Sequence, residues 1–278
     1  MRRLDYLDLF AAERGELLRL LGELKPAEWA ALTECPAWSV KGIVLHLLGD
    51  DLSILSRQRD GEPSRVAIEA GNDWDQLFAI LDRHNELWVD ASSSFGVPLL
   101  LELLRLSGDW TQRWYATVDA DSLGEPIAWI SPEPAPYWLL TAREYLERWI
   151  HHQQIRRAIG RPGWGIDERW GVPAVAVAVR GFPLGFGVIP VDDGTTVTFA
   201  VDGGPAWTVA RERGEWSLFD GAPADPTTRF SLDLETAALL FSRAMTRPEL
   251  EARVLPEGDA ELGGLVVFGL SAFFGREV

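Results

Sequence analysis

The chain has 278 residues, of which 47% are hydrophobic and 24% are charged, so it carries enough apolar material for a sizeable core in one or two domains. Its 26 basic and 42 acidic residues give a net charge of −16, which repels nucleic-acid phosphates and anionic lipids at long range. The single cysteine, Cys35, excludes an internal disulfide bond and a cysteine-rich zinc site, so any metal must be held by histidine and carboxylate.

Apolar residues recur at three- and four-residue spacing from Arg3 to about Arg161, which predicts a largely helical region. Ser39 is well placed to cap the second helix. The proline-rich stretch "SPEPAPYW" predicts a long connection before the last helix. We expect a bundle with at least one long crossover, built from Leu7–Leu24, a helix after Ser39 that stops at Gly61, Trp74–Ser92, a helix within residues 97–118, and residues 137–160.

The composition changes after "RPGWG", and we place a domain boundary there, with a helical domain at residues 1–163 and an α+β domain at residues 164–278. A helix is expected around Glu168–Arg180, followed by a loop through "GFPLGFGVIPVDDG". Four short segments, several with period-two alternation, predict an antiparallel meander: "TVTFAVDG", "AWTVARERG", "EWSLFDG" and "TTRFSLD". Helical periodicity returns in "LETAALLFSRAM" and "DAELGGLVVFGLSAFF".

No segment has the pattern of a signal peptide, and no uninterrupted apolar run approaches the ~20 residues that span a bilayer. The glycines of "GFPLGFG" lack the spacing and the strand-to-helix setting of a nucleotide-binding motif. We therefore expect a cytoplasmic protein without nucleic-acid partners and without membrane insertion.

One pair of residues in the last helix of the first domain has the spacing of metal ligands. Glu147 and His151 are four residues apart, so their side chains emerge on one helix face with Cβ atoms roughly 5–6 Å apart. His46, in the apolar run "IVLHLL", is a possible third ligand, and three protein ligands with an open position are typical of catalytic zinc. Two other interpretations stay open, because spacing does not say that these helices touch. His46 would then be a hydrogen-bonded core residue, and Glu147 and His151 a surface pair.

Several neighbours of these residues have both a structural and a functional interpretation. Asp50, four residues beyond His46, is an acceptor near such a site or part of a solvated helix end, and we favour the solvated end. Arg143 lies along the face of Glu147 and is a candidate neighbour of the metal, although a surface ion pair is the commoner role.

Other polar residues of this region are expected to lie outside the site. Arg148 points away from the face of Glu147 and is favoured as a surface ion-pair residue. His152 lies about 100° around the helix from His151, which predicts a rim or surface position. Cys35 has no base near it in sequence and is expected to be a structural thiol. In the second domain, Trp207 and Trp216 are expected in the core.

Four segments, taken in order, resemble the N-terminal metal-binding domain of the mycothiol-dependent maleylpyruvate isomerase family, within the DinB-like superfamily. They are "CPAWSVKGIVLHLLGDD", "LDRHNELWV", "SPEPAPYWL" and "REYLERWIHHQQIRRAIGRPG", and the similarity covers most of residues 5–163. In the second domain, "FSLDLETAALLFSRAM" and "GLSAFF" resemble the sterol-carrier-protein-like domain that follows in many of these proteins.

The resemblance implies a DinB-like four-helix bundle followed by a smaller α+β sterol-carrier-like domain with an antiparallel sheet. It also implies that His46, Glu147 and His151 hold a divalent metal, taken as zinc. Such proteins use a low-molecular-weight thiol such as mycothiol, which implies isomerisation or thiol transfer on a small electrophilic substrate.

Two positions depart from the pattern of many relatives. Gly42 stands where an acidic residue is common, and Gln154 stands where an aspartate is common. A neutral amide at 154 can still accept a hydrogen bond from the second nitrogen of His151, but it polarises the imidazole less than a carboxylate does. Both departures bear on catalysis more than on metal binding.

A third possibility is a metal-free bundle in which His46, Glu147 and His151 only hydrogen-bond to one another. A rival interpretation from a different class is a non-enzymatic, metal-containing protein that binds an apolar small molecule in its C-terminal domain. This rival interpretation predicts that an apolar molecule still binds when His46 is removed, whereas the enzyme interpretation predicts a metal that an added thiol can reach. The sequence leaves the substrate, the thiol and the choice between monomer and homodimer open.

Overall fold

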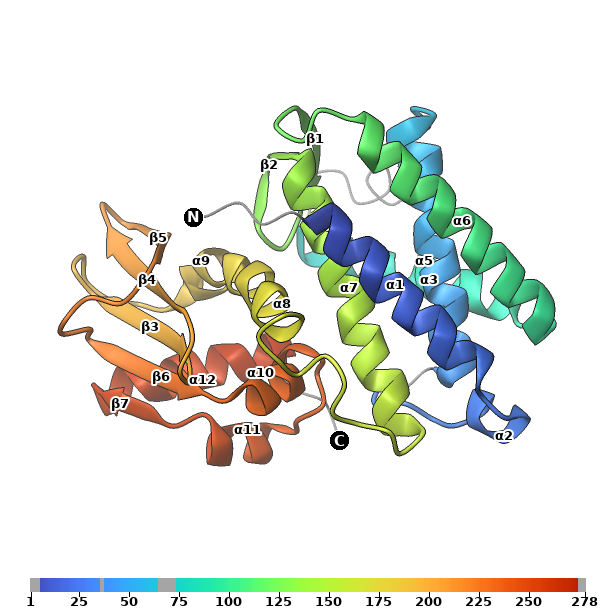
Figure 1. Ribbon diagram of the computed structural model, residues 1–278. Coiled ribbons are helices and arrows are strands. Elements are labelled where there is room, and N and C mark those ends of the chain that lie inside the picture. The colour runs from blue at the N-terminus through green and yellow to red at the C-terminus, as the bar shows by residue number, and fades with distance from the viewer. Residues whose placement is uncertain (1–5, 36–37, 65–73, 275–278) are drawn as a thin grey trace. The chain divides into compact units, whose positions relative to one another are not determined.

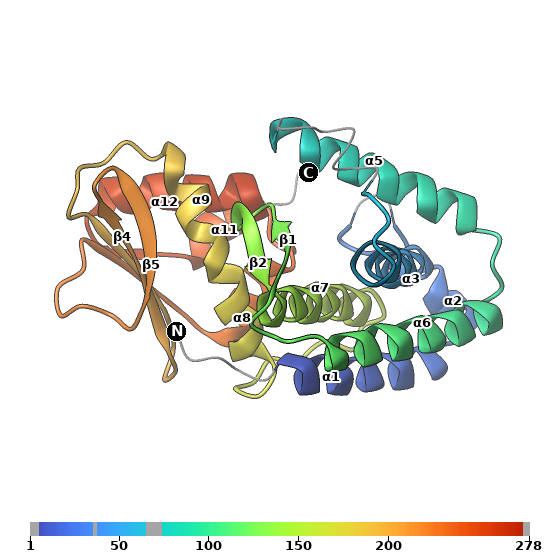
Figure 2. The same cartoon turned by 90° about the horizontal axis from the view of Figure 1, so that it is seen from above.

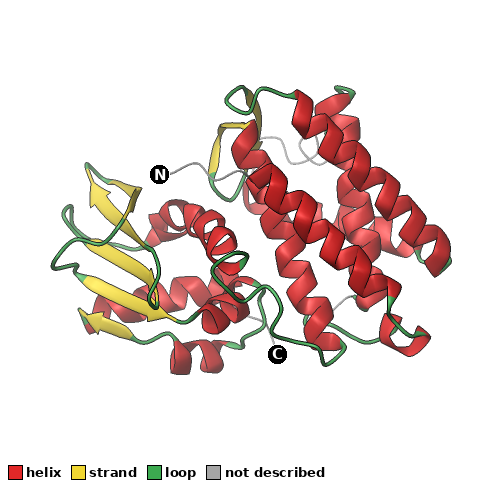
Figure 3. Cartoon of the chain, viewed as in Figure 1, coloured by secondary structure: helices red, strands yellow, loops and turns green. Residues whose placement is uncertain are grey.

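The computed structural model describes residues 6–35, 38–64 and 74–274. The chain divides into two compact units. The helical unit comprises residues 5–128 and 133–160, and the α+β unit comprises residues 129–132 and 161–278. Figure 3 shows that the larger sheet belongs to the α+β unit, while long helices dominate the helical unit.

The helices of the helical unit agree closely with the periodicity of the sequence. Ser39 caps the second long helix as predicted, because its side chain accepts a hydrogen bond from the Gly42 amide. The predicted helix to Gly61 is α-helical only in its first part and continues as a single π-helical segment. The elements are α1 (Tyr6–Gly22), α2 (Pro26–Trp29), α3 (Val40–Ile54), the π-helix η1 (Leu55–Arg59), α5 (Trp74–Ser92), α6 (Val97–Thr117) and α7 (Tyr137–Ala158).

Helix α7 is buried on almost every side, which matters for the site that it carries. It packs against α1 and α3, and α6 packs against both of these helices (Figures 1 and 2). Apolar side chains from α1, α3, α6 and α7 form the core of the unit, among them Leu17, Ile43, Leu104 and Ile155. Polar residues of α7 that face this packing must therefore find partners inside the protein.

The proline-rich connection is partly a strand, contrary to the sequence prediction. Residues Ser131–Pro136 form β2, which pairs with β1 (Leu123–Ile127) in a two-stranded sheet. The prolines of "SPEPAP" occupy alternate positions, and successive amides of a strand point to opposite sides. A strand with a single neighbour can turn all of these proline nitrogens away from that neighbour.

The α+β unit contains a five-stranded sheet and several helices. Its sheet has the strand order β5-β4-β3-β6-β7. Its strands are β3 (Thr196–Val201), β4 (Ala206–Glu212), β5 (Glu215–Asp220), β6 (Thr228–Leu232) and β7 (Pro256–Gly258). Its helices are α8 (Gly171–Ala178), the 3-10 helix η2 (Val179–Gly181), α9 (Phe182–Gly185), the 3-10 helix η3 (Phe186–Val188), α10 (Leu234–Phe241), α11 (Arg247–Arg253) and α12 (Ala260–Phe274).

The predicted antiparallel meander is wrong at β6. Strands β3, β4 and β5 are antiparallel in sequence order, with a tight turn at Arg213 and Gly214, both at positive φ. Strand β6, however, pairs in parallel with β3. Residues 221–227 lack a hairpin turn and are long enough to carry the chain past β4 to the free edge of β3. The predicted loop after Arg180 is also partly wrong, because it contains α9 and η3.

Aromatic side chains fill the core of the α+β unit. Phe199 stacks on Phe230 with ring centroids 5.0 Å apart and contacts Phe182 at 4.4 Å. Trp207 and Trp216 are buried, which confirms their predicted core positions. Among the described residues, one stretch, Gly171–Val188, is long and apolar enough to cross a membrane, but half of it is buried, as in the core helix of a soluble protein.

Candidate metal centre

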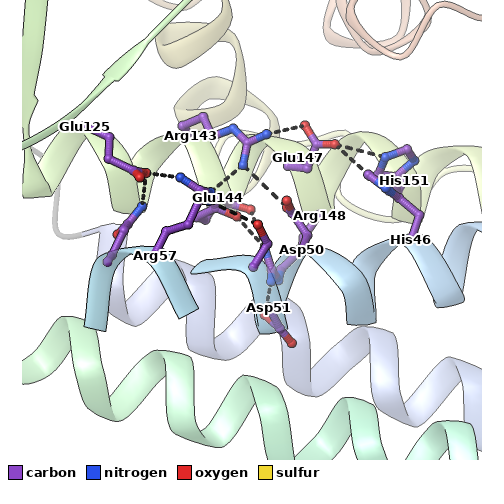
Figure 4. Close-up of polar contacts among 12 residues, drawn as sticks. His46, Asp50, Asp51, Arg57, Glu125, Arg143, Glu144, Glu147, Arg148 and His151 are labelled. Atoms are coloured by element: carbon purple, nitrogen blue, oxygen red, sulfur yellow. Dashed lines mark hydrogen bonds and ion pairs between the residues drawn. The ribbon is translucent and has the colours of Figure 1, made fainter. Parts of the chain in front are cut away.

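Three side chains from two helices converge on one point of the helical unit. His46 lies in the middle of α3, and Glu147 and His151 lie one turn apart on α7. The Nε2 atoms of His46 and His151 are 3.2 and 3.1 Å from the same carboxylate oxygen, Glu147 Oε1 (Figure 4). One candidate ligand atom from each residue lies within 4.8 Å of the others. The structure thus brings together the three residues that the sequence nominated.

A hydrogen bond fixes which nitrogen of His151 faces Glu147. His151 Nδ1 lies 2.8 Å from the acceptor Gln154 Oε1, so Nδ1 carries the proton and donates it. A neutral imidazole has a single N–H, so Nε2 presents a lone pair to Glu147 Oε1. Two lone pairs at 3.1 Å repel unless a proton or a cation lies between them. This geometry is suited to a metal ion.

Arg143 lies one turn before Glu147 on α7 and contacts three carboxylates. Its guanidinium is 3.8 Å from Glu147 Oε2, the oxygen that the histidines do not contact. It also donates to Glu144 Oε1 at 2.5 Å and to Asp50 Oδ2 at 3.4 Å. The favoured solvated position of Asp50 is wrong, because its side chain is only 13% exposed and faces α7. Arg143 forms the ion pairs that were expected of it, but its side chain is half-buried rather than on the surface.

These contacts set the charge states around the cluster. Burial by itself raises the pKa of Glu147, but Arg143 and the contacts with His151 and His46 outweigh it, and the pKa lies well below its usual range. Burial also raises the pKa of Asp50, and Arg143 again reverses the direction, so that this pKa is lowered. For Glu144 burial dominates over the opposing Arg143 and raises the pKa to about 7. Glu147 is therefore ionised at neutral pH.

Arg148 does not lie on the surface, contrary to prediction. It is buried between α7 and α3, where it forms an ion pair with Asp51 and donates to Glu144 Oε2 at 3.0 Å. Asp51 also accepts a hydrogen bond from Ser107 of α6 at 2.9 Å. Burial nevertheless raises the pKa of Asp51, which Arg148 opposes. This pair supports the packing of α3 against α7 behind the cluster.

His152 is fully buried, so its predicted rim position is also wrong. Its Nδ1 lies 2.8 Å from Glu13 of α1, and Arg156 donates to its Nε2 at 2.9 Å. Burial lowers the pKa of His152, and the Glu13 carboxylate opposes this shift. The sequence argument assumed that one face of α7 meets solvent, whereas α1 covers the face that carries His152. Cys35 was expected to be a buried structural thiol, and it is only half-buried.

Sequence reasoning missed one residue of the cluster, Trp38. Its ring stacks on the ring of His46, with centroids 4.8 Å apart and planes 28° apart. Spacing gave no clear signal, because Trp38 lies before the N-cap Ser39, outside α3, where helical periodicity does not apply.

Comparison with known proteins connects this cluster to a family. A profile described as the mycothiol maleylpyruvate isomerase N-terminal domain matches residues 10–156. Two similar solved structures are crystal structures of the mycothiol-dependent maleylpyruvate isomerase and of a histidine-to-alanine mutant, with TM-scores of 0.58 and 0.57.

Both solved structures are 11% identical to this chain, and the match covers 94% of this chain and 96% of theirs. At this identity the likeness shows a shared fold alone. No curated protein sequence matches the chain. The profile spans more than half of the sequence and includes all three residues of the cluster. The chain therefore belongs to the mycothiol maleylpyruvate isomerase family.

Proposed function

We propose that this protein is a metal-dependent enzyme that uses a low-molecular-weight thiol, mycothiol or a close relative, for isomerisation or thiol transfer on a small electrophilic substrate. The observation that carries the proposal is the convergence of two imidazole nitrogens on one oxygen of an ionised glutamate. Membership of the mycothiol maleylpyruvate isomerase family supports the choice of thiol and of reaction class.

The donor set fits a divalent metal such as zinc. Two imidazole nitrogens and one carboxylate oxygen form a common catalytic zinc set, and ligands bound tetrahedrally at ~2.1 Å lie roughly 3.4 Å apart. The two contacts to Glu147 Oε1, at 3.2 and 3.1 Å, are close to that separation. The charge of the surroundings fits as well. Glu144, with its pKa raised to about 7, is only partly ionised at neutral pH, and the remaining carboxylates still leave excess negative charge for a cation to neutralise. The groups concerned are the carboxyls of Asp50, Asp51, Glu144 and Glu147 and the guanidiniums of Arg143 and Arg148.

Each residue of the cluster has a distinct task in this proposal. When bound, the metal supplies a Lewis acid that lowers the pKa of a thiol, so that a thiolate is available at neutral pH. His46, Glu147 and His151 would hold the ion. Gln154 keeps the proton of His151 on Nδ1, and Arg143 occupies the second oxygen of Glu147. The cofactor brings the nucleophile, so the protein needs no catalytic cysteine.

We also propose finer assignments for the architecture. The helical unit would be a DinB-like four-helix bundle, supported by the mutual packing of α1, α3, α6 and α7. The second unit would be of the sterol-carrier type, and its mixed sheet with flanking helices is compatible with such a fold. The expected location is the cytoplasm, with a small molecule as substrate.

The proposal is tested by elemental analysis of the purified protein beside His46→Ala and His151→Ala, each titrated by calorimetry with a panel of small thiols. We expect one divalent metal per wild-type chain, much less in either variant, and heat of thiol binding only where metal is present. His84→Ala is the matched control, because His84 lies on α5, outside the cluster.

Two results would count against the enzyme. A wild-type protein that takes up no stoichiometric metal under metal-replete conditions contradicts it directly. The rival binding protein would be favoured by two results together. The bound metal would give no heat of binding with any thiol, and an apolar molecule would copurify with wild type and with His46→Ala alike.

A further inference from the structure

His46 and His151 differ in how the structure fixes their rings. A metal-binding histidine usually donates its second N–H to a nearby acceptor, which sets the orientation of the ring. His151 has such a partner in Gln154. Within the described part of the chain, the only hydrogen-bond contact of His46 is that of Nε2 with Glu147. The rotation of an imidazole about its last side-chain bond is broad, so another contact must hold the ring of His46.

The indole of Trp38 provides that contact. The two rings are nearly parallel, with planes 28° apart and centroids 4.8 Å apart, which is an offset-stacked geometry. The stack covers one face of the imidazole, while the edge-to-face contact with His151 lies at 4.9 Å. Rotation of the His46 ring away from Glu147 would therefore break the stack.

The backbone around Trp38 is itself held in place. The Trp38 carbonyl accepts hydrogen bonds from the hydroxyl of Thr33 at 2.8 Å and from its amide at 3.3 Å. The Trp38 amide donates to the carbonyl of Cys35 at 3.0 Å. Trp38 also packs against the apolar core of the helical unit. The indole is thus a fixed surface for the imidazole to lie on.

Gly42 makes room for this indole. A Cβ atom added at Gly42 would lie 2.9 Å from Trp38 Cβ and 3.3 Å from Trp38 Cγ. A distance under 3.0 Å forces one of the two groups to move, and Trp38 is the neighbour that must yield. With Trp38 in this position there is no room for a Cβ atom at position 42, so Gly42 allows Trp38 to lie close to the start of α3.

We propose that Trp38 is a positioning residue for His46, and that its stack takes the place of the hydrogen bond that would otherwise orient this ligand. The inference rests on the proposed metal site and adds a determinant of its affinity. Cation binding makes the imidazole electron-poor, and tryptophan is the aromatic side chain that attracts positive charge most strongly over its face. The stack therefore favours the metal-bound ring over the free ring.

The test compares the metal affinity of the wild type with those of Trp38→Leu and Trp38→Phe, measured by competition with a chromogenic zinc chelator. We expect Trp38→Leu to bind zinc about 10–100-fold more weakly, the range typical for loss of a residue that orients a ligand. Trp38→Phe keeps a ring on His46 and should recover most of that affinity. The absorption spectrum of the Co²⁺-loaded protein should change in Trp38→Leu and return toward wild type in Trp38→Phe.

Matched controls separate positioning from a general loss of folding. Trp88 also packs against α3, where it donates to the Leu45 carbonyl, and Trp88→Leu should not weaken zinc binding comparably. Gly42→Ala should weaken zinc binding by displacing Trp38, whereas Gly15→Ala on α1 has no neighbour within 4 Å and should not. Wild-type affinity in Trp38→Leu or in Gly42→Ala overturns the inference and leaves the proposed function intact. A wild type that binds no zinc at all overturns both.

Discussion

Glu147 offers its two carboxylate oxygens to different partners. Oε1 faces both imidazoles, and Oε2 faces Arg143. Gln154 completes the arrangement by accepting the Nδ1 proton of His151. Mutation of a residue that hydrogen-bonds to a metal ligand typically lowers metal affinity about 10–100-fold. Because Gln154 is a neutral amide, replacing it by an acid of nearly the same shape makes this influence measurable.

Substitution of Gln154 should change zinc affinity in two directions. Gln154→Leu removes the acceptor for the Nδ1 proton of His151. The ring can then rotate, and the proton can move to the other nitrogen. We therefore expect zinc affinity to be about 10–100-fold lower. Gln154→Glu has nearly the same shape and adds a negative charge, which makes His151 a more basic ligand, so affinity should rise. Chelator competition at neutral pH measures both. Equal affinities in all three proteins would show that this hydrogen bond does not orient His151.

Tyr115 carries a polar atom that the fold leaves without a partner. Its ring is buried at an edge-to-face contact with Phe10, and its hydroxyl has no hydrogen-bond partner among the described residues. Burial also raises the pKa of this hydroxyl well above its usual value. A buried donor without a partner costs about 1–3 kcal/mol. Tyr115→Phe should therefore keep or increase the free energy of unfolding in urea, and a loss of more than about 1 kcal/mol would reveal a partner of the hydroxyl.

Helix α7 carries two of the candidate metal ligands together with buried ion pairs, because α1 and α3 pack against it. Arg148 reaches Asp51 on α3, and His152 reaches Glu13 on α1. A buried ion pair contributes little net stability, because desolvation offsets most of the attraction, but loss of one partner leaves a buried charge. These pairs therefore fix how α7 lies against its neighbours more than they stabilise the fold.

The Asp51–Arg148 pair provides a prediction at this scale. Arg148→Met alone should lower the free energy of unfolding by about 3–5 kcal/mol, because it leaves Asp51 buried without its cation. The double variant Asp51→Leu/Arg148→Met removes both charges. Its loss of unfolding free energy should be clearly smaller than the sum of the losses in the two single variants. Urea unfolding of the metal-free proteins measures this cycle. Additive losses would mean that the two side chains do not interact.

The sequence predicted the helices well because their apolar spacing is regular and their ends carry clear signals, such as Ser39 before α3. It failed where partners distant in sequence decide the structure. The prolines of "SPEPAP" suggest a loop, because its pairing with β1 is not visible in the local sequence. The local sequence of β6 likewise does not indicate that this strand pairs in parallel with β3. The candidate ligands were identified by spacing and resemblance. Arg148 and His152 were misplaced, because periodicity alone does not reveal that α3 and α1 pack against the faces of α7 that carry them.

At the scale of the whole molecule, the family profile matches about half of the chain, whereas the solved structures match almost all of it. The profile matches residues 10–156, which lie almost entirely in the helical unit and include the metal cluster. The solved structures match 94% of the chain, so the α+β unit shares their fold as well. The net charge of −16 would repel a nucleic-acid phosphate backbone at long range.

The central claim is that His46, Glu147 and His151 hold a metal that an exogenous thiol can reach. The most direct measurement is the absorption spectrum of the Co²⁺-substituted protein during titration with mycothiol. We predict a saturable new charge-transfer band in the wild type at one equivalent of Co²⁺ per chain, and its absence from His46→Ala and His151→Ala. A wild-type spectrum that does not change with thiol, or a band that survives in both variants, would contradict the account.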